Sequence, residues 1–140
     1  MALAGGKQVG VGRRLVVEQL SEDHGARSLQ LPGYALVEMD VADDMANIHN
    51  ITHGGAIFSL IDEAFELSSN SHGTIAVALN MSITFHRPPT RGAKVRAESK
   101  EIHLSRKTAT YDIKVTEGGE RLIASCQAMV YRKKEKLPFL

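Results

Sequence analysis

The sequence predicts an α+β fold in which an antiparallel sheet of five to six strands wraps around one long central helix. Two observations favour this fold: one long segment has the apolar periodicity of a helix, and the chain after it has only strand-like patterns. A single apolar helix must be covered, and a curled antiparallel sheet covers it economically. The 140 residues suffice for one domain, expected over 12–132, between a flexible N-terminus over 1–11 and a basic tail over 133–140.

The segments before the helix are short. Residues 12–22 could form a short helix, and residues 43–52 are polar and predict a loop. Residues 27–31 and 34–41 predict two strands of a hairpin, because the second segment alternates well and a Pro-Gly turn signal lies between them.

The clearest helix is predicted over residues 53–70. Its apolar side chains recur at helical spacing on one face, at Ile57, Leu60, Ile61, Ala64 and Phe65. Additional apolar residues lie off this stripe, so we expect the helix to be largely buried. Gly73 suits the left-handed conformation that often ends a helix.

The rest of the chain alternates as strands do. The predicted strands cover residues 74–86, 94–104, 109–115 and 122–131. A Gly-Gly pair at 118–119 predicts a hairpin turn between the last two strands.

Composition excludes several classes of protein. Apolar residues make up 43% and charged residues 24%, which argues against a disordered chain. No apolar run approaches the roughly 18 residues that span a bilayer, and residues 1–20 contain no apolar stretch long enough for a secretion signal. The lone Cys126 cannot form an internal disulfide. We therefore expect a soluble cytoplasmic protein without a membrane partner.

Charge is unevenly distributed although the net charge is only +1. Residues 91–140 carry 12 basic and 6 acidic side chains, which could attract an anionic ligand or could simply face solvent. Nucleic acid is not an expected partner, because only 5% of residues are aromatic and no known binding motif occurs.

An unusual group of polar residues and glycines surrounds the predicted start of the helix. Asn47, His49 and His53 precede the adjacent Gly54 and Gly55. The two glycines either form a tight turn or let a ligand approach the backbone. A helix N-terminus offers unpaired N–H donors that suit a developing oxyanion. The two histidines straddle the junction of loop and helix, so we expect no metal despite their spacing.

Asp62 lies two turns into the apolar helix, where an aspartate is rare unless it is functional, interfacial or hydrogen-bonded. It follows Gly54 by eight residues, or about 12 Å along the helix. A nucleophile and an oxyanion donor must both lie within about 3 Å of the reacting group. If both residues are catalytic, a homodimer with antiparallel helices must bring them together.

Three motifs stand out in combination: Asn47-x-His49-x-x-x-His53-Gly54-Gly55-x-x-Phe58-x-Leu60-x-Asp62-x-Ala64-Phe65, then Asn70-Ser71-x-Gly73, then Ile83-Thr-Phe85-x-Arg87-Pro88. Together they resemble the hotdog-fold acyl-CoA thioesterases of the PaaI type, over about residues 12–132. The spacing from His-Gly-Gly to Leu-x-Asp is a fairly specific signal of this family, whereas His-Gly-Gly alone would be weak evidence for it.

The resemblance implies hydrolysis of an acyl-CoA to free acid and coenzyme A, with no cofactor beyond the coenzyme A of the substrate. Gly54 would donate its backbone N–H to the thioester carbonyl, and Asp62 would be the nucleophile or the general base. Asn47 would position the carbonyl or the water, and His53 would hold the loop and polarise the thioester. The family forms homodimers that often pair into homotetramers.

Candidate substrate-binding residues can also be named; the resemblance supports Arg106 and Lys107, and the other candidates follow from their residue types and positions. Gly55 would leave space for the substrate at the helix start. The candidates for the pocket of an aryl or medium-chain acyl group are Phe58, Leu60, Ile61 and Phe65. The candidates for the phosphates are Arg106 and Lys107, at a turn between two strands, then Arg87, Arg132 and Lys133.

The chain departs from one branch of the family, in which a serine on the strand after the helix assists the water. The corresponding position is Ala78, and Ser82 is a weak substitute. Two other functions stay open. A hotdog hydratase or dehydratase would use His49 or His53 with Asp62 to move a proton at an acyl α-carbon. A dimer that only binds acyl-CoA would have no turnover.

Overall fold

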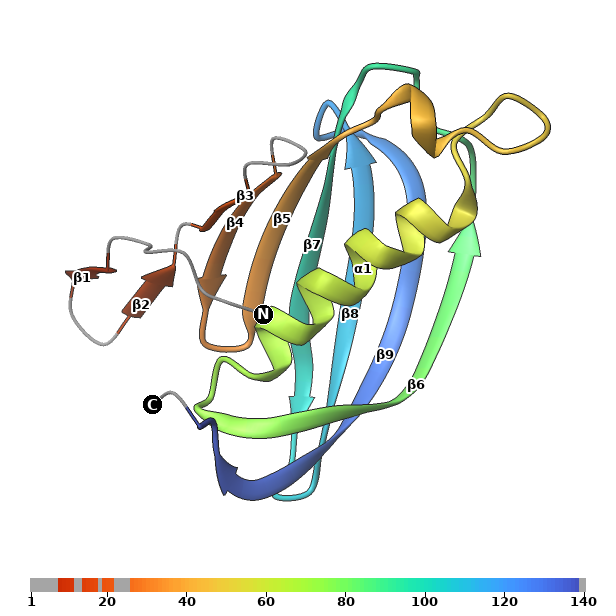
Figure 1. The fold of residues 1–140 in the computed structure, drawn as a ribbon. Helices are drawn as coiled ribbons and strands as arrows, with labels where there is room; N and C mark the ends of the chain where they lie inside the picture. Colours follow the sequence, from red (N-terminus) through yellow and green to blue (C-terminus); the bar gives the residue numbers. More distant parts are fainter. Residues whose placement is uncertain (1–7, 12–13, 18, 22–25, 139–140) are drawn as a thin grey trace.

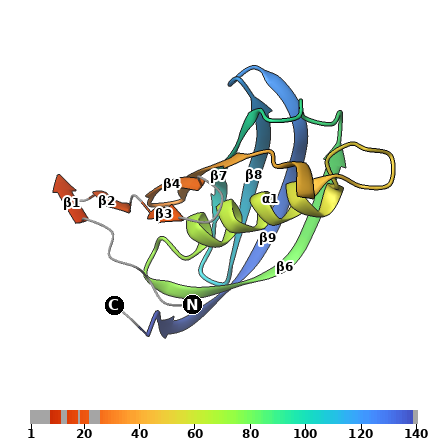
Figure 2. The same cartoon turned by 45° about the horizontal axis from the view of Figure 1, so that its top comes forward.

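In the computed structural model the described backbone comprises residues 8–11, 14–17, 19–21 and 26–138, with side chains described from residue 28 onward. One helix, α1 (Gly54–Ser69), lies in the curve of a twisted sheet (Figures 1 and 2). A single 3-10 turn, Asp43–Met45, precedes it. The strands are β1 (Gln8–Val11), β2 (Arg14–Val17), β3 (Gln19–Ser21), β4 (Ala26–Leu31), β5 (Tyr34–Asp40), β6 (Thr74–Phe85), β7 (Lys94–Leu104), β8 (Thr108–Glu117) and β9 (Arg121–Lys136).

The main sheet is antiparallel throughout, with the order β3-β4-β5-β7-β8-β9-β6. This is the α+β hotdog architecture, and the predicted fold class is confirmed. All six predicted strands are present, and the short β3 is an addition to them. β1 and β2 form a separate two-stranded ribbon.

Both ends of the chain differ from expectation. The short helix predicted within residues 12–22 is wrong, because the described part of that range forms β2 and β3. The β-branched Val16 and Val17 favour a strand, and pairing with β4 fixes β3. Of the predicted flexible N-terminus, residues 1–7 lie outside the described residues and Gln8–Val11 forms β1. β9 reaches into the predicted basic tail, because Lys136 still pairs with Thr74 of β6.

The core lies between α1 and the concave face of the sheet. The predicted apolar face of the helix is buried there. The rings of Phe65 and Tyr111 pack edge to face, with their centroids 5.6 Å apart. Ser68 and Ser99 share a hydrogen bond of 2.7 Å between their hydroxyls, which satisfies both groups inside the core. Cys126 is buried among these residues, and burial raises the pKa of its thiol to about 11.

The opposite face of α1 is exposed in the single chain, so the prediction of a largely buried helix is wrong for one chain. This face carries Gly55, Phe58, Ser59, Asp62, Glu63 and Glu66. β6 lies at the edge of the sheet beside it, and Val77, Leu79 and Phe85 of this strand are exposed. An apolar edge strand of this kind is available for pairing with another chain. No described helix is long and apolar enough to cross a membrane.

Candidate active site

The first turn of α1 leaves one backbone donor free. His53 precedes the helix in an extended conformation, and its Nδ1 accepts a hydrogen bond from the N–H of Gly55 at 2.9 Å. The carbonyl of His53 accepts from the N–H of Ala56 at 3.0 Å. The N–H of Gly54 has no hydrogen-bond partner among the described residues. This donor is therefore available to a ligand at the positive end of the helix dipole.

The same contacts indicate the tautomer of the neutral His53 ring. Because Nδ1 accepts a hydrogen bond, the proton of the neutral imidazole must reside on Nε2. The backbone N–H of His53 bonds to the carbonyl of Met45 at 2.6 Å and anchors the loop to the helix start. His53 thus anchors the loop through its backbone and caps the helix through Nδ1, which leaves Nε2–H as the ring donor.

Asn47 organises the loop before the helix. Its side-chain carbonyl accepts from the N–H groups of His49 at 2.9 Å and Ile51 at 3.4 Å. Asn50 closes the same loop in the left-handed conformation, with a φ of 59°. The side-chain NH2 of Asn47 has no partner among the described residues, so this residue can act toward a ligand as a donor.

The two glycines at the helix start differ in how much room a side chain would have. A Cβ atom at Gly55 would lie 3.0 Å from Nδ1 of His53 and would disturb the cap. A Cβ atom at Gly54 would lie 3.4 Å from the ring of Phe85, which projects from the end of β6. The aromatic ring of Phe85 therefore lies beside Gly54, whose N–H is free. It belongs to a predicted motif, but it had no predicted role, because sequence spacing cannot show a contact across 31 residues.

Asp62 lies two turns further along α1, on the exposed face. Its neighbours Glu63 and Glu66 make this part of the surface acidic. Desolvation, and secondarily the charge of Glu66, raise the pKa of Glu63 above its ordinary value. Within residues 28–138 no group of three or more His, Cys, Asp or Glu side chains could hold a metal ion.

The structure brings some predicted site residues together and separates others. Asn47, His53, Gly54 and Gly55 form one group at the loop–helix junction. Phe58 and Phe65, predicted to share an acyl pocket, differ in burial: the side chain of Phe58 is exposed, and that of Phe65 is buried in the core. Leu60 and Ile61 are buried with Phe65 in the core.

The residues predicted to contact the phosphates lie at two different ends of the molecule. Arg87 follows β6 at the end of the sheet where α1 begins. Arg106 and Lys107 are exposed at the turn between β7 and β8, at the opposite end (Figure 1). One chain therefore cannot direct all three cations at the same phosphate groups.

Comparison with known proteins identifies the family. Residues 49–124, more than half of the chain, match the family model described as the Thioesterase superfamily. The chain belongs to the thioesterase superfamily. It is an enzyme of the thioester hydrolase class, and the predicted resemblance to the PaaI type is confirmed.

Individual members of the superfamily are clearly similar to this chain. A relative from Archaeoglobus fulgidus is 46% identical over 86% of this chain and 79% of its own. Acyl-coenzyme A thioesterase PaaI of Escherichia coli is 36% identical over 71% of each chain. The solved structure of that protein superposes with a TM-score of 0.74, covering 79% of this chain and 80% of the other. A Streptococcus mutans protein, solved bound to acetyl CoA, gives a TM-score of 0.74 at 26% identity over 85% of this chain and 95% of its own.

Proposed function

We propose that this thioesterase hydrolyses aryl- or medium-chain acyl-CoA to the free acid and coenzyme A. The proposed machinery is the Gly54 N–H of one subunit and the Asp62 carboxylate of its partner. The observation that carries the proposal is the free N–H of Gly54, which precedes two N–H groups that His53 already satisfies, those of Gly55 and Ala56. PaaI of Escherichia coli and the acetyl-CoA complex from Streptococcus mutans support the substrate class.

The free donor suits the charge that develops during thioester hydrolysis. Attack on the carbonyl carbon moves an electron pair onto the carbonyl oxygen, and the Gly54 N–H stabilises that oxyanion. The Nε2–H of His53 and the NH2 of Asn47 project from the same short segment and position the thioester or the water. The exposed ring of Phe85 supplies an apolar surface for the acyl group beside the donor.

Asp62 completes the reaction in one of two ways. As a general base, it takes a proton from water while the water oxygen bonds to the carbonyl carbon. The tetrahedral intermediate then collapses, the C–S bond breaks, and the proton passes to the departing thiolate. As a nucleophile, the carboxylate displaces the thiolate to form a mixed anhydride, which water hydrolyses to the free acid and the regenerated carboxylate while the released proton passes to the thiolate. Both routes consume one water and need no cofactor.

The proposed site requires two subunits. Along one helix Gly54 and Asp62 are separated by about 12 Å, which is too far for one carbonyl group. A two-fold dimer with antiparallel α1 helices places the Asp62 of each subunit near the Gly54 of the other. The exposed edge strand β6 and the exposed Phe58 support an interface on this side. Two such dimers could then pair into a homotetramer.

Thiol release from a panel of acyl-CoAs tests the activity. The panel runs from acetyl to palmitoyl and includes phenylacetyl, hydroxyphenylacetyl and benzoyl. We expect Asp62→Asn to lower kcat by at least about a hundredfold while binding survives, since it removes the base or nucleophile. Glu66→Gln, one turn later on the same face, is the matched control and keeps wild-type turnover. Equal turnover in wild type and Asp62→Asn would exclude Asp62 from the mechanism.

Mixed dimers test the shared site. Two inactive variants, Asp62→Asn and Gly54→Pro, are co-expressed with different tags. A mixed dimer has one doubly damaged site and one intact site, so random pairing restores about a quarter of wild-type sites. If both residues served a site within one chain, every site in the mixture would be damaged and no activity would return.

A further inference from the structure

The turn between β7 and β8 is held by a dense set of hydrogen bonds. The N–H of Ser105 donates to the carbonyl of Thr108 at 2.8 Å, and the N–H of Thr108 donates to the hydroxyl of Ser105 at 3.0 Å. The two hydroxyls lie 2.9 Å apart as a further hydrogen bond. These contacts leave Arg106 and Lys107 at the exposed tip.

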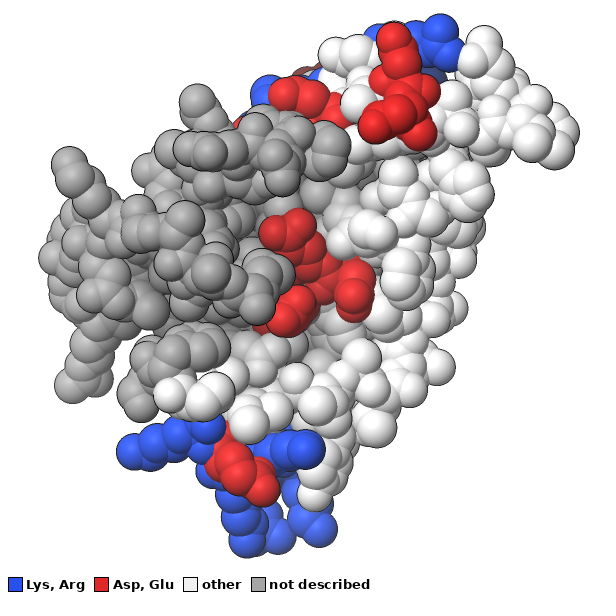
Figure 3. All heavy atoms as spheres, viewed as in Figure 1, with Lys and Arg blue, Asp and Glu red and all other residues white. Residues whose placement is uncertain are grey.

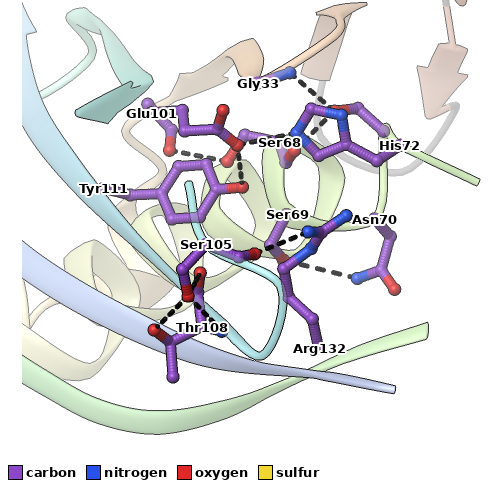
Figure 4. A network of polar contacts seen from close by, with 12 residues as sticks. Gly33, Ser68, Ser69, Asn70, His72, Glu101, Ser105, Thr108, Tyr111 and Arg132 are labelled. Atoms are coloured by element: carbon purple, nitrogen blue, oxygen red, sulfur yellow. Dashed lines mark hydrogen bonds and ion pairs between the residues drawn. The ribbon is translucent and has the colours of Figure 1, made fainter. Parts of the chain in front are cut away.

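Arg132 of β9 secures this turn from the side. Its backbone N–H donates to the carbonyl of Lys107 at 2.7 Å, and its guanidinium Nη1 donates to the carbonyl of Ser105 at 2.7 Å. Figure 4 shows the guanidinium beside Ser105, below the end of α1. Arg132 is only partly exposed, unlike the two cations at the tip. Its side chain is therefore committed to the backbone of the turn.

The cations at this turn have no ion pair within the part of the chain whose side chains are described. Among the described residues, no carboxylate pairs with Arg106, Lys107 or Arg132. Figure 3 shows Lys and Arg gathered at this end of the molecule, with acidic atoms among them. Like charges held this close repel one another, and a bound polyanion relieves the repulsion. A rigid turn keeps the cations in place for such an anion.

We propose that Arg132 is a positioning residue, which fixes the Ser105 carbonyl so that Arg106 and Lys107 are presented to the phosphates of coenzyme A. The proposal rests on the proposed function. Within one chain the turn and Gly54 lie at opposite ends of α1, about 22 Å apart along the helix. In an antiparallel dimer the turn of one subunit lies at the end where the partner's helix begins. The turn thus serves the site whose oxyanion donor belongs to the other subunit.

Two substrates with the same acyl group separate this role from a structural one. One is the acyl-CoA, and the other is the N-acetylcysteamine thioester, which has no phosphates. We expect Arg132→Gln to raise KM for the acyl-CoA about tenfold, because the variant loses a charged hydrogen bond to the turn. The kcat should stay within about twofold of the wild-type value. The truncated thioester should show no such change. Arg132→Lys keeps one donor and should recover most of the loss.

A double-mutant cycle distinguishes positioning from direct phosphate contact. If Arg132 acts through the turn, Arg132→Gln has little left to affect once Arg106 and Lys107 are both replaced by Gln. Adding it to that double variant should then raise KM by less than about twofold. Arg121→Gln removes an equal charge from β9 at its far end, where Arg121 pairs with Glu117, and should leave KM unchanged.

Three results would overturn the inference: an unchanged KM in Arg132→Gln, equal losses on both thioesters, or independent effects in the cycle. If Arg132→Gln does not fold, the KM of Arg132→Lys on the two thioesters decides the question. A wild-type protein that hydrolyses neither thioester would instead refute the proposed function.

Discussion

Gly54→Pro removes the proposed oxyanion donor with little disturbance of the backbone. Gly54 is the first residue of α1, a position where proline is favoured because its N–H has no partner in the helix. The preceding His53 has φ −61° and ψ 134°, an extended conformation compatible with a following proline. The substitution therefore deletes one N–H group and keeps the helix.

The expected loss of activity is large compared with the change in stability. Removing one oxyanion donor typically lowers kcat by about 10²- to 10³-fold, or about 2.7–4 kcal/mol. Proline restricts the unfolded chain and could add about 0.4–1 kcal/mol of stability, and its Cβ atom would lie at an ordinary contact distance of 3.4 Å from the ring of Phe85. We therefore expect nearly unchanged thermal unfolding and a strongly reduced kcat.

Gly54→Ala is the matched control for crowding. It places a Cβ atom 3.4 Å from the ring of Phe85, an ordinary contact distance, and keeps the N–H. Thiol-release kinetics of both variants on the best acyl-CoA, with circular dichroism melts, give the comparison. A folded Gly54→Pro whose kcat stays within about threefold of Gly54→Ala would show that the oxyanion is stabilised elsewhere.

Two other predictions concern the groups around the helix. His53→Ala should lower the free energy of unfolding by about 1 kcal/mol, because the N–H of Gly55 loses its cap. His53→Asn should restore that stability in urea denaturation but not kcat if Nε2–H polarises the thioester; equal recovery of both would limit His53 to the cap. For Tyr111, burial and the hydrogen bond to Glu101 at 2.7 Å raise the pKa of the phenol above its ordinary value. A raised pKa favours the neutral phenol in the fold, so its contribution to stability is complete below about pH 10 and falls as pH rises further. Urea denaturation from pH 8 to 11 should show the wild type losing stability relative to Tyr111→Phe only above about pH 10. If the free energies of unfolding of the two proteins change in parallel over this range, the pKa of Tyr111 is not raised in the fold.

The sequence was informative wherever one segment decided its own structure. The helical spacing of Ile57, Leu60, Ile61, Ala64 and Phe65 predicted the buried face of α1, because each of these side chains packs on the sheet. The Gly-Gly pair at 118–119 predicted its hairpin, since both residues adopt positive φ, 64° and 78°.

The sequence was less informative where distant segments decide the outcome. The described part of residues 12–22 is extended because β3 pairs with β4, a contact that local patterns do not encode. Phe58 and Asp62 were expected in a buried helix, yet their face is open in one chain. A sequence pattern reports that a face is apolar without reporting whether a strand of the same chain or a partner covers it.

The two halves of the proposed site therefore differ in how they are built. The donor half comes from a single loop and helix start, and its hydrogen bonds run between residues that are close in sequence. These contacts fix both the tautomer of His53 and the free N–H of Gly54 in one chain. The carboxylate half needs a second subunit, because no bend of a continuous helix can remove the separation of about 12 Å. It follows that dimerisation would supply the reactive carboxylate to a donor site that is already organised, so association and catalysis would be coupled through the same helix.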